Sequence, residues 1–125
     1  MIESLVQYIQ DIDTYKFVNP QDFPKQRGVY LIFQNNTIIY IGESQNLYKR
    51  INLQHISSRN NFKNSAFRRS LCQRDNKKPG VELKNWILNN CRFKCIEIED
   101  RDLCCLVEKA LIYKFRQKNN NLLNK

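Results

Sequence analysis

Glu108 is the residue whose surroundings in the sequence most directly suggest chemistry. Its neighbours at helical spacing, Cys104, Leu111, Ile112 and Phe115, are apolar. A carboxylate on an apolar helix face is costly unless it is paired with a cation or bound to a metal. The sequence therefore leaves two roles for Glu108, an ion pair with a neighbouring arginine or a metal ligand.

A strongly basic stretch is the second chemical feature. Residues 49–78 hold nine Lys and Arg against one acid, in a chain of net charge +9. Asn, Gln and Ser, which bind phosphate oxygens and base edges, are frequent there, and Phe62 and Phe67 offer stacking or core surfaces. A solvated surface is the alternative. We predict nucleic-acid contacts by Lys49, Arg59, Lys63, Arg68, Arg69, Arg74, Lys77 and Lys78.

Two tyrosines lie in a predicted β-hairpin. Runs of β-branched and aromatic residues at 28–33 and 38–42 surround an Asn-Asn turn. Because side chains alternate along a strand, Tyr30 and Tyr40 share a face only if paired residue numbers add to an even value. A strict two-residue turn gives an odd sum. We therefore predict an odd-length loop or a β-bulge that brings the two phenols together.

The hairpin motifs resemble those of the GIY-YIG nuclease family. The sequence has Gly28-Val29-Tyr30, then Tyr40-Ile41-Gly42, then Asn46-Leu47 and Arg50. The resemblance extends over residues 24–124. It implies an endonuclease, a hydrolase that cuts phosphodiester bonds and leaves 5′-phosphate and 3′-hydroxyl ends.

The resemblance also implies a role for each matching residue. Tyr30 would accept a proton from the attacking water with metal help, while Tyr40 and Arg50 would position the scissile phosphate. Glu108 would be the sole protein ligand of Mg²⁺ or Mn²⁺, an ion that keeps much of its water. Asn124, in Leu122-Leu123-Asn124, best matches the family's asparagine after the last helix.

Two positions depart from the family pattern. Family members often carry a histidine four residues after the arginine, where this chain has Gln54, and its one histidine is His55. Either the helix end bends to bring His55 inward for proton transfer, or the imidazole faces phosphate or solvent. No proline precedes Leu122, and Asn119, Asn120 and Asn121 compete with Asn124 for the family position.

The expected architecture is α+β: a three-stranded antiparallel sheet, made of the hairpin and one later strand, flanked by helices. We expect one domain over 1–125, with an N-terminal helix and linker at 1–26 and a basic insert at 57–80. Further helices are predicted over 45–56 with Ser44 as cap, over 65–73, over 82–88, and from Asp100 or Asp102 to about 117. The third strand is predicted over 92–99.

The remaining composition limits the class of protein. No apolar run reaches the roughly 18 residues of a membrane span, and five cysteines without a C-x-x-C pair are typical of reduced thiols. We expect a cytoplasmic protein that acts on nucleic acid, DNA in preference to RNA. The insert, a homodimer or a partner protein would supply specificity. An inactive nucleic-acid-binding module is the alternative function, followed by a structural or protein-interaction domain.

Overall fold

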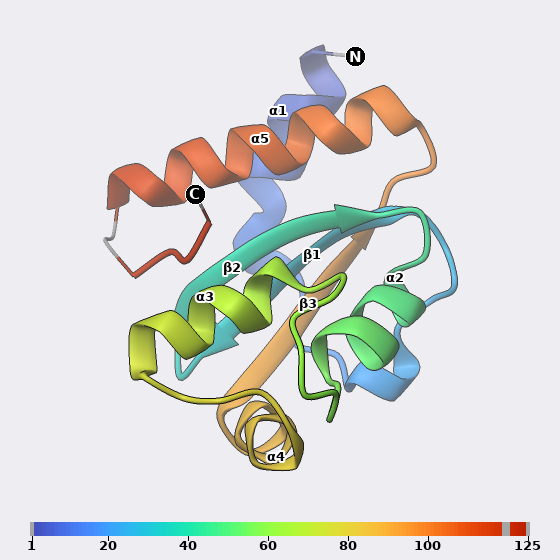
Figure 1. Cartoon of the computed structure of the whole chain (residues 1–125). Helices are drawn as coiled ribbons and strands as arrows, with labels where there is room; N and C mark the ends of the chain where they lie inside the picture. The colour runs from blue at the N-terminus through green and yellow to red at the C-terminus, as the bar shows by residue number, and fades with distance from the viewer. Residues whose placement is uncertain (1, 119–120, 125) are drawn as a thin grey trace.

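An antiparallel sheet of order β2-β1-β3 forms the centre of the molecule (Figure 1). The computed structural model describes residues 2–118 and 121–124. The strands are β1 Gly28–Gln34, β2 Thr37–Ser44 and β3 Cys91–Glu97. Every residue of β1 except the last is buried, because helices cover both faces of the central strand. The predicted α+β class and the strand pairing are confirmed.

Helices form a layer on each face of the sheet (Figure 1). One layer contains α1 Ile2–Gln10 and the long α5 Arg101–Lys118. The other contains α2 Leu47–Lys49, the π-helix η3 Arg50–His55, α3 Ala66–Asp75 and α4 Val81–Asn90. Short 3₁₀ turns, η1 Asp11–Thr14 and η2 Pro20–Asp22, join α1 to the sheet. Two hydrophobic clusters follow from this layering, one on each face.

The hairpin contains the predicted irregularity. Asn35 adopts a left-handed conformation (φ 56°) in the turn, and the strand ends pair Phe33 with Ile38. The next pair is Ile32 with Tyr40, so one residue of β2 bulges out of the register. Because of this bulge, Tyr30 and Tyr40 lie on the same face, and the prediction is confirmed.

The helix after the hairpin differs from its prediction. Asn46, not Ser44, caps it, since the Asn46 side chain accepts a bond of 2.9 Å from the backbone N–H of Lys49. The Ser44 hydroxyl instead accepts from the N–H of Asn46. The predicted single helix is divided into α2 and the π-helix η3, so the Ser44 cap and the uniform helix over 45–56 are wrong.

The other helix ends agree with the sequence. Ser65 caps α3 through the N–H of Arg68, and Asp100 caps α5 through the N–H of Leu103 at 2.8 Å. In the described part of the chain, no helix is long and apolar enough to serve as a membrane span.

Candidate active site

The aromatic side of the site lies on the face of the sheet covered by η3 and α3. The rings of Tyr30 and Tyr40 stack with centroids 6.3 Å apart, and the His55 ring lies 5.3 and 5.9 Å from them. Phe67 of α3 closes the cluster, 5.4 Å from both Tyr40 and His55. Gly42 makes room for it, since a Cβ there would overlap the Tyr30 hydroxyl and ring. The last glycine of the hairpin motif is thus explained by packing against the first tyrosine.

The π-turn of η3 brings His55 into this cluster. A π-helix closes i→i+5 hydrogen bonds, so residues five apart lie on one face. Ile56 N–H bonds the Ile51 carbonyl at 2.8 Å in this pattern, and His55, five residues after Arg50, points into the core with 2% of its surface exposed. In an ideal α-helix Gln54, four residues after Arg50, would share the inward face with it. In the π-helix His55, five residues after Arg50, points inward instead.

A buried hydrogen-bonded chain joins three elements through this histidine. Tyr30 Oη lies 2.7 Å from His55 Nε2, and His55 Nδ1 lies 2.7 Å from Ser65 Oγ. Ser65 Oγ also accepts from the N–H of Arg68 at 3.2 Å. The imidazole is fixed at both nitrogens, the arrangement that sets a tautomer and a ring orientation.

Burial controls protonation in the chain. Desolvation, followed by the charges of Arg50 and Arg68, lowers the pKa of His55 to about 3, so its imidazole is neutral at physiological pH. Desolvation and the neighbouring Tyr40 raise the pKa of Tyr30 far above its usual range, and burial raises that of Tyr40 too. In the resting site Tyr30 is therefore a protonated phenol and His55 a neutral imidazole.

Arg50 contributes the positive charge nearest the phenols. Its charge and its hydrogen bond to Tyr30 oppose the rise in the pKa of that residue. Its Nε is buried and has no hydrogen-bond partner, and the same is true of the Gln54 side-chain oxygen. Both residues line a cleft of about 280 Å³ that also contains Glu43 and Lys49. A half-buried guanidinium that lines an open cleft is suited to an anionic ligand.

Glu108 reaches the site from the opposite layer, across the edge of β2. Burial, and then the nearby charge of Glu43, raise the pKa of Glu108, while the backbone N–H of Glu43 donates to its carboxylate. The charge of Glu108 in turn raises the pKa of Tyr30 and of Tyr40. In the described residues the single ion pair is Arg74–Asp75, so the predicted alternative of an ion pair for Glu108 is not found.

Asn124 completes the edge of β2. Its amide accepts from Ile41 N–H at 2.9 Å and donates to the Ile41 carbonyl at 2.6 Å, while Leu123 N–H bonds the Ile39 carbonyl at 2.7 Å. The tail thereby covers an otherwise open strand edge beside Tyr40. Both ends of the amide bind backbone, so Asn124 positions the strand. Asn119 and Asn120, its competitors in the sequence, lie outside the described residues.

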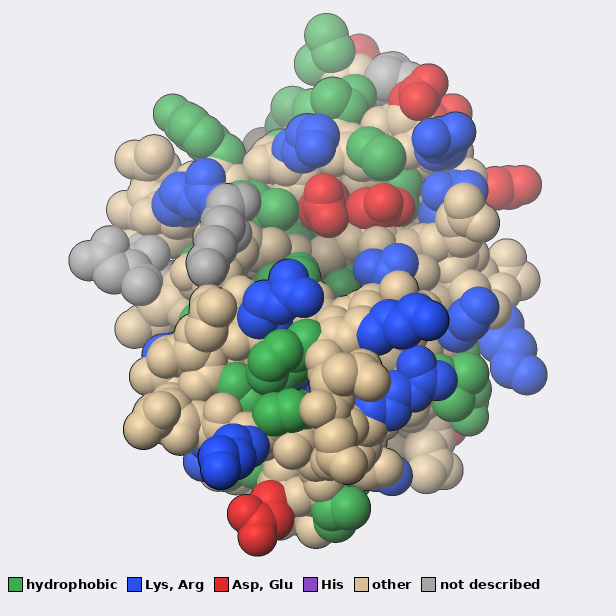
Figure 2. Space-filling model, in the orientation of Figure 1, with side chains coloured by type: hydrophobic (Ala, Val, Ile, Leu, Met, Phe, Trp, Pro, Cys, Tyr) green, Lys and Arg blue, Asp and Glu red, His purple; other side chains and the backbone are tan. Residues whose placement is uncertain are grey.

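The predicted nucleic-acid residues divide into exposed and buried ones. On the face shown in Figure 2, acidic side chains gather below α5, and Lys and Arg side chains lie across the half below them. Lys49, Arg59, Lys63, Arg69, Lys77 and Lys78 are exposed. Arg68 is 0% exposed, and its guanidinium donates to the carbonyls of Asn61 and Arg59 at 2.7 Å each. The prediction for Arg68 is wrong, because a guanidinium with no exposed surface cannot contact a phosphate.

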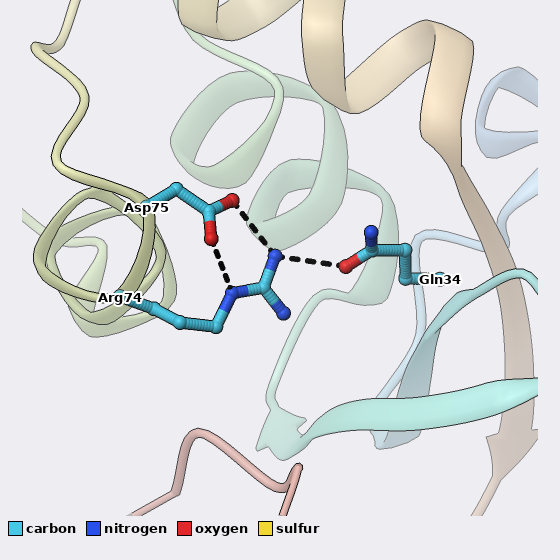
Figure 3. Close-up of polar contacts among 3 residues, drawn as sticks. All are labelled: Gln34, Arg74 and Asp75. Carbon is cyan, nitrogen blue, oxygen red and sulfur yellow. Dashed lines mark hydrogen bonds and ion pairs between the residues drawn. The ribbon is translucent and has the colours of Figure 1, made fainter.

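Arg74 is exposed but already engaged. Its guanidinium pairs with Asp75, with Nε 2.7 Å from Oδ1, and donates to the side-chain oxygen of Gln34 at 2.8 Å (Figure 3). These contacts tie the end of α3 to the end of β1. Its charge is largely neutralised by Asp75, so Arg74 adds less to the positive surface than its neighbours.

Sequence reasoning missed Ser65 as a partner of His55 and Glu43 as a neighbour of Glu108. Ser65 was predicted only as the start of a helix. Its contact with His55 depends on the π-turn, which no local sequence pattern predicts. Glu43 follows Gly42 at the end of a strand, and its position on the same side of β2 as Ile41 could have been read from strand alternation.

Residues 8–125 match the family model described as the GIY-YIG catalytic domain. The chain belongs to this family. It is therefore a GIY-YIG nuclease domain, and the predicted family and enzyme class are confirmed. No curated protein matches it in sequence.

Solved GIY-YIG structures are similar to this chain at low identity. The N-terminal endonuclease domain of UvrC from Thermotoga maritima, bound to its catalytic divalent cation magnesium, is 20% identical with a TM-score of 0.47, covering 93% of this chain and 94% of that one. A point mutant of the same domain, also bound to its catalytic divalent cation, is 21% identical with a TM-score of 0.47, covering 78% and 84%.

Proposed function

We propose that this GIY-YIG domain is a metal-dependent endonuclease that hydrolyses phosphodiester bonds in DNA. The observation that carries the proposal is the packing of Tyr30, Tyr40 and His55 against one another, with the charges of Arg50 and Glu108 acting on the pKa values of both phenols. The neutral His55, 2.7 Å from Tyr30, supports this function over the alternative of an inactive binding module. That alternative depended on a displaced histidine.

Tyr30 is the proton acceptor for the attacking water in this mechanism. A phenol with a raised pKa is a poor base unless its own proton leaves as another arrives. His55 Nε2 receives the Tyr30 proton, provided that Nδ1–H donates to Ser65 Oγ and leaves Nε2 unprotonated. An incoming phosphate also offsets the Arg50 charge that lowers the pKa of His55. The proton thus moves from water to Tyr30 and from Tyr30 to His55.

Arg50 and Tyr40 bind the scissile phosphate. The half-buried guanidinium of Arg50 lines a cleft that admits a phosphate. A fixed guanidinium opposes the charge that grows on the phosphate oxygens in the transition state. Tyr40, half-buried between the pocket and the edge, orients the same group with its hydroxyl.

Glu108 fits a single Mg²⁺ or Mn²⁺. Its carboxylate is partly desolvated, has no counter-ion among the described residues, and is oriented by the N–H of Glu43. No described group of three or more His, Cys, Asp or Glu residues forms a closed metal site. An ion held by one carboxylate, water and substrate phosphate is typical of Mg²⁺. When bound, the ion supplies Lewis-acid stabilisation of the leaving 3′ oxygen.

Substrate and compartment follow from charge and thiols. The exposed Lys and Arg side chains of 49–78 supply phosphate contacts, with 57–80 as the insert that binds DNA outside the cleavage site. The five cysteines are free thiols in the structure, which fits a reducing compartment such as the cytoplasm. The products would carry 5′-phosphate and 3′-hydroxyl ends.

Cleavage of supercoiled plasmid with Mg²⁺ or Mn²⁺ tests the proposal. We expect the wild-type chain to nick the plasmid and Tyr30→Phe to lose nicking by at least about 100-fold, since general base catalysis contributes about 10²–10⁴. DNA binding should be unchanged. Tyr113→Phe, which alters an exposed tyrosine of α5, is the matched control and should cleave normally.

Two results would count against the proposal. Full cleavage by Tyr30→Phe would remove that phenol from the mechanism. Tight binding by the wild-type chain without nicks in either metal would favour the inactive module instead.

A further inference from the structure

A groove of about 770 Å³ lies at the end of the basic segment, apart from the cleft beside Arg50. Loop residue Asn60 lines one side, and residues 76–83 with Trp86 of α4 line the other. Its volume lies within the range of about 300–1,000 Å³ usual for ligand sites. No step proposed above uses this groove.

Trp86 is the chain's single tryptophan. It is half-buried and packs against the hydrophobic cluster, and the Lys77 ammonium lies 5.3 Å from its ring centroid. Because Trp86 lines the groove and is only half-buried, part of the ring faces the open space. The residue thus offers an aromatic surface with a positive charge beside it.

The walls of the groove are fixed by buried contacts. Arg68 holds the carbonyls of Arg59 and Asn61, on both sides of Asn60, at 2.7 Å each. Gly80 has a φ of 133°, and a Cβ there would lie 3.0 Å from the Asn60 side-chain oxygen. The buried arginine and the glycine therefore set the width of the groove before any ligand binds.

The lining suits an unpaired nucleotide. Lys77 and Lys78 supply phosphate contacts, the Trp86 indole supplies a stacking surface, and Asn60 and Asn76 supply amides for base edges. Glu82, the single acid in the lining, accepts hydrogen bonds from base amino groups and repels phosphate from its end. A duplex keeps its base faces stacked inside, so this aromatic surface serves bases that are unpaired.

The groove is connected to the active site by one short loop. Residues 57–65 run from the groove at Asn60 to Ser65, whose hydroxyl lies 2.7 Å from His55 Nδ1. We infer that the groove binds unpaired nucleotides of the DNA substrate, so that the enzyme cuts beside a single-stranded segment such as a flap, gap or branch. This inference rests on the proposed endonuclease function.

Trp86 fluorescence tests the inference directly, because no other tryptophan contributes. A short oligothymidylate should change the emission in a saturable way. A blunt duplex of the same length, shown to bind by anisotropy, should leave the emission unchanged. Equal changes with both DNAs, or no change with the single strand, would overturn the inference, as would a change produced only by an acidic peptide.

Variants give an independent measurement. Base stacking on an aromatic side chain corresponds to about 5- to 150-fold in affinity, so Trp86→Leu should weaken binding of a flapped duplex by that factor and of a blunt duplex by less than about two-fold. Because Trp86 also packs on the core, Lys77→Ala is the second variant, and Lys16→Ala, an exposed lysine outside the segment, is its control. A loss with Lys77→Ala that is larger for the blunt duplex than for the flapped duplex would contradict a groove for unpaired bases.

Failure of this inference and failure of the proposed function give different results. If the groove does not bind unpaired bases, the wild-type chain still nicks plasmid, and Trp86→Leu binds flapped DNA as tightly as the wild-type chain does. If the chain is an inactive module, the oligothymidylate still changes the Trp86 emission while no DNA is cut.

Discussion

The two sides of strand β2 differ in how their polar groups are satisfied. On the η3 side, Tyr30, His55 and Ser65 form a buried chain in which each contact is 2.7 Å and each group is neutral. On the α5 side, Glu108 and Glu43 lie near each other, and neither is in an ion pair among the described residues. Folding thus satisfies the hydrogen bonds of the neutral groups on the η3 side and leaves the carboxylates on the α5 side without a counter-ion.

This difference separates the roles of the two sides. Neutral groups are buried at little cost when hydrogen-bonded, so the phenol–imidazole pair is preorganised. Neighbouring carboxylates without a counter-ion are costly, and a divalent cation relieves that cost. Arg50 bridges the sides, since its charge acts on the pKa values of Tyr30, His55 and Glu108.

Removing Arg50 should have the largest effect on cleavage. We expect Arg50→Ala to lower the cleavage rate at saturating DNA by about 10²–10³, the usual cost of losing a fixed donor to a developing negative charge. Arg59→Ala removes an exposed arginine of the same segment and should weaken DNA affinity while sparing the saturated rate. Single-turnover cleavage measures both. An Arg50→Ala rate equal to that of Arg59→Ala would contradict the assignment.

Removing the hydrogen bond between Ser65 and His55 should have a smaller effect on cleavage. Ser65→Gly removes the hydroxyl that holds His55 Nδ1, and glycine caps a helix only a few tenths of a kcal/mol less well than serine. We expect kcat to fall about 10- to 100-fold with KM unchanged, and Ser65→Thr, which retains the hydroxyl, to recover most of it. Steady-state kinetics with a pH profile measures this. An unchanged kcat in the glycine variant would limit Ser65 to capping α3.

The smallest effect concerns stability and pH. His55 has a pKa of about 3 when folded against about 6.5 when unfolded, so the unfolded chain binds more protons between these values. The contribution of neutral His55 to the free energy of unfolding is complete above about pH 6.5. It decreases as the pH falls toward 3, by at most about 1.4 kcal/mol per pH unit. Denaturant unfolding should therefore show a steeper loss below pH 6.5 for the wild-type chain than for His55→Gln. If the free energy of unfolding fell with pH equally in the wild-type chain and in His55→Gln, the buried neutral imidazole would be contradicted.

Features encoded by local pattern could be predicted from the sequence. The parity of strand pairing required either an odd-length loop or the bulge that places Tyr30 beside Tyr40. Asp100 was one of two predicted caps of the last helix, because its side chain can accept from a free N–H group. The apolar neighbours of Glu108 marked it as a special carboxylate. Each of these signals lies within a few residues of the feature it predicts.

Features set by tertiary contacts could not be predicted. The π-turn that moves His55 inward is a distortion fixed by packing against Phe67 and Tyr30, whereas spacing in an ideal helix pointed it away. Arg68 was expected at the surface because arginine usually is, but its guanidinium is buried on the backbone carbonyls of Asn61 and Arg59 in the preceding loop, whose path the sequence pattern does not show. Asn124 was matched as a catalytic residue, while its pairing with Ile41 is visible only in space.

Metal binding by Glu108 is the measurement that tests the account most directly. Mn²⁺ binding, followed by electron paramagnetic resonance or calorimetry, should be lost in Glu108→Ala together with nicking, while DNA affinity is retained. Glu99→Ala, which removes an exposed carboxylate before α5, should bind the ion and cut as the wild-type chain does. Wild-type cleavage and Mn²⁺ affinity in Glu108→Ala would contradict the claim that this carboxylate holds the catalytic ion.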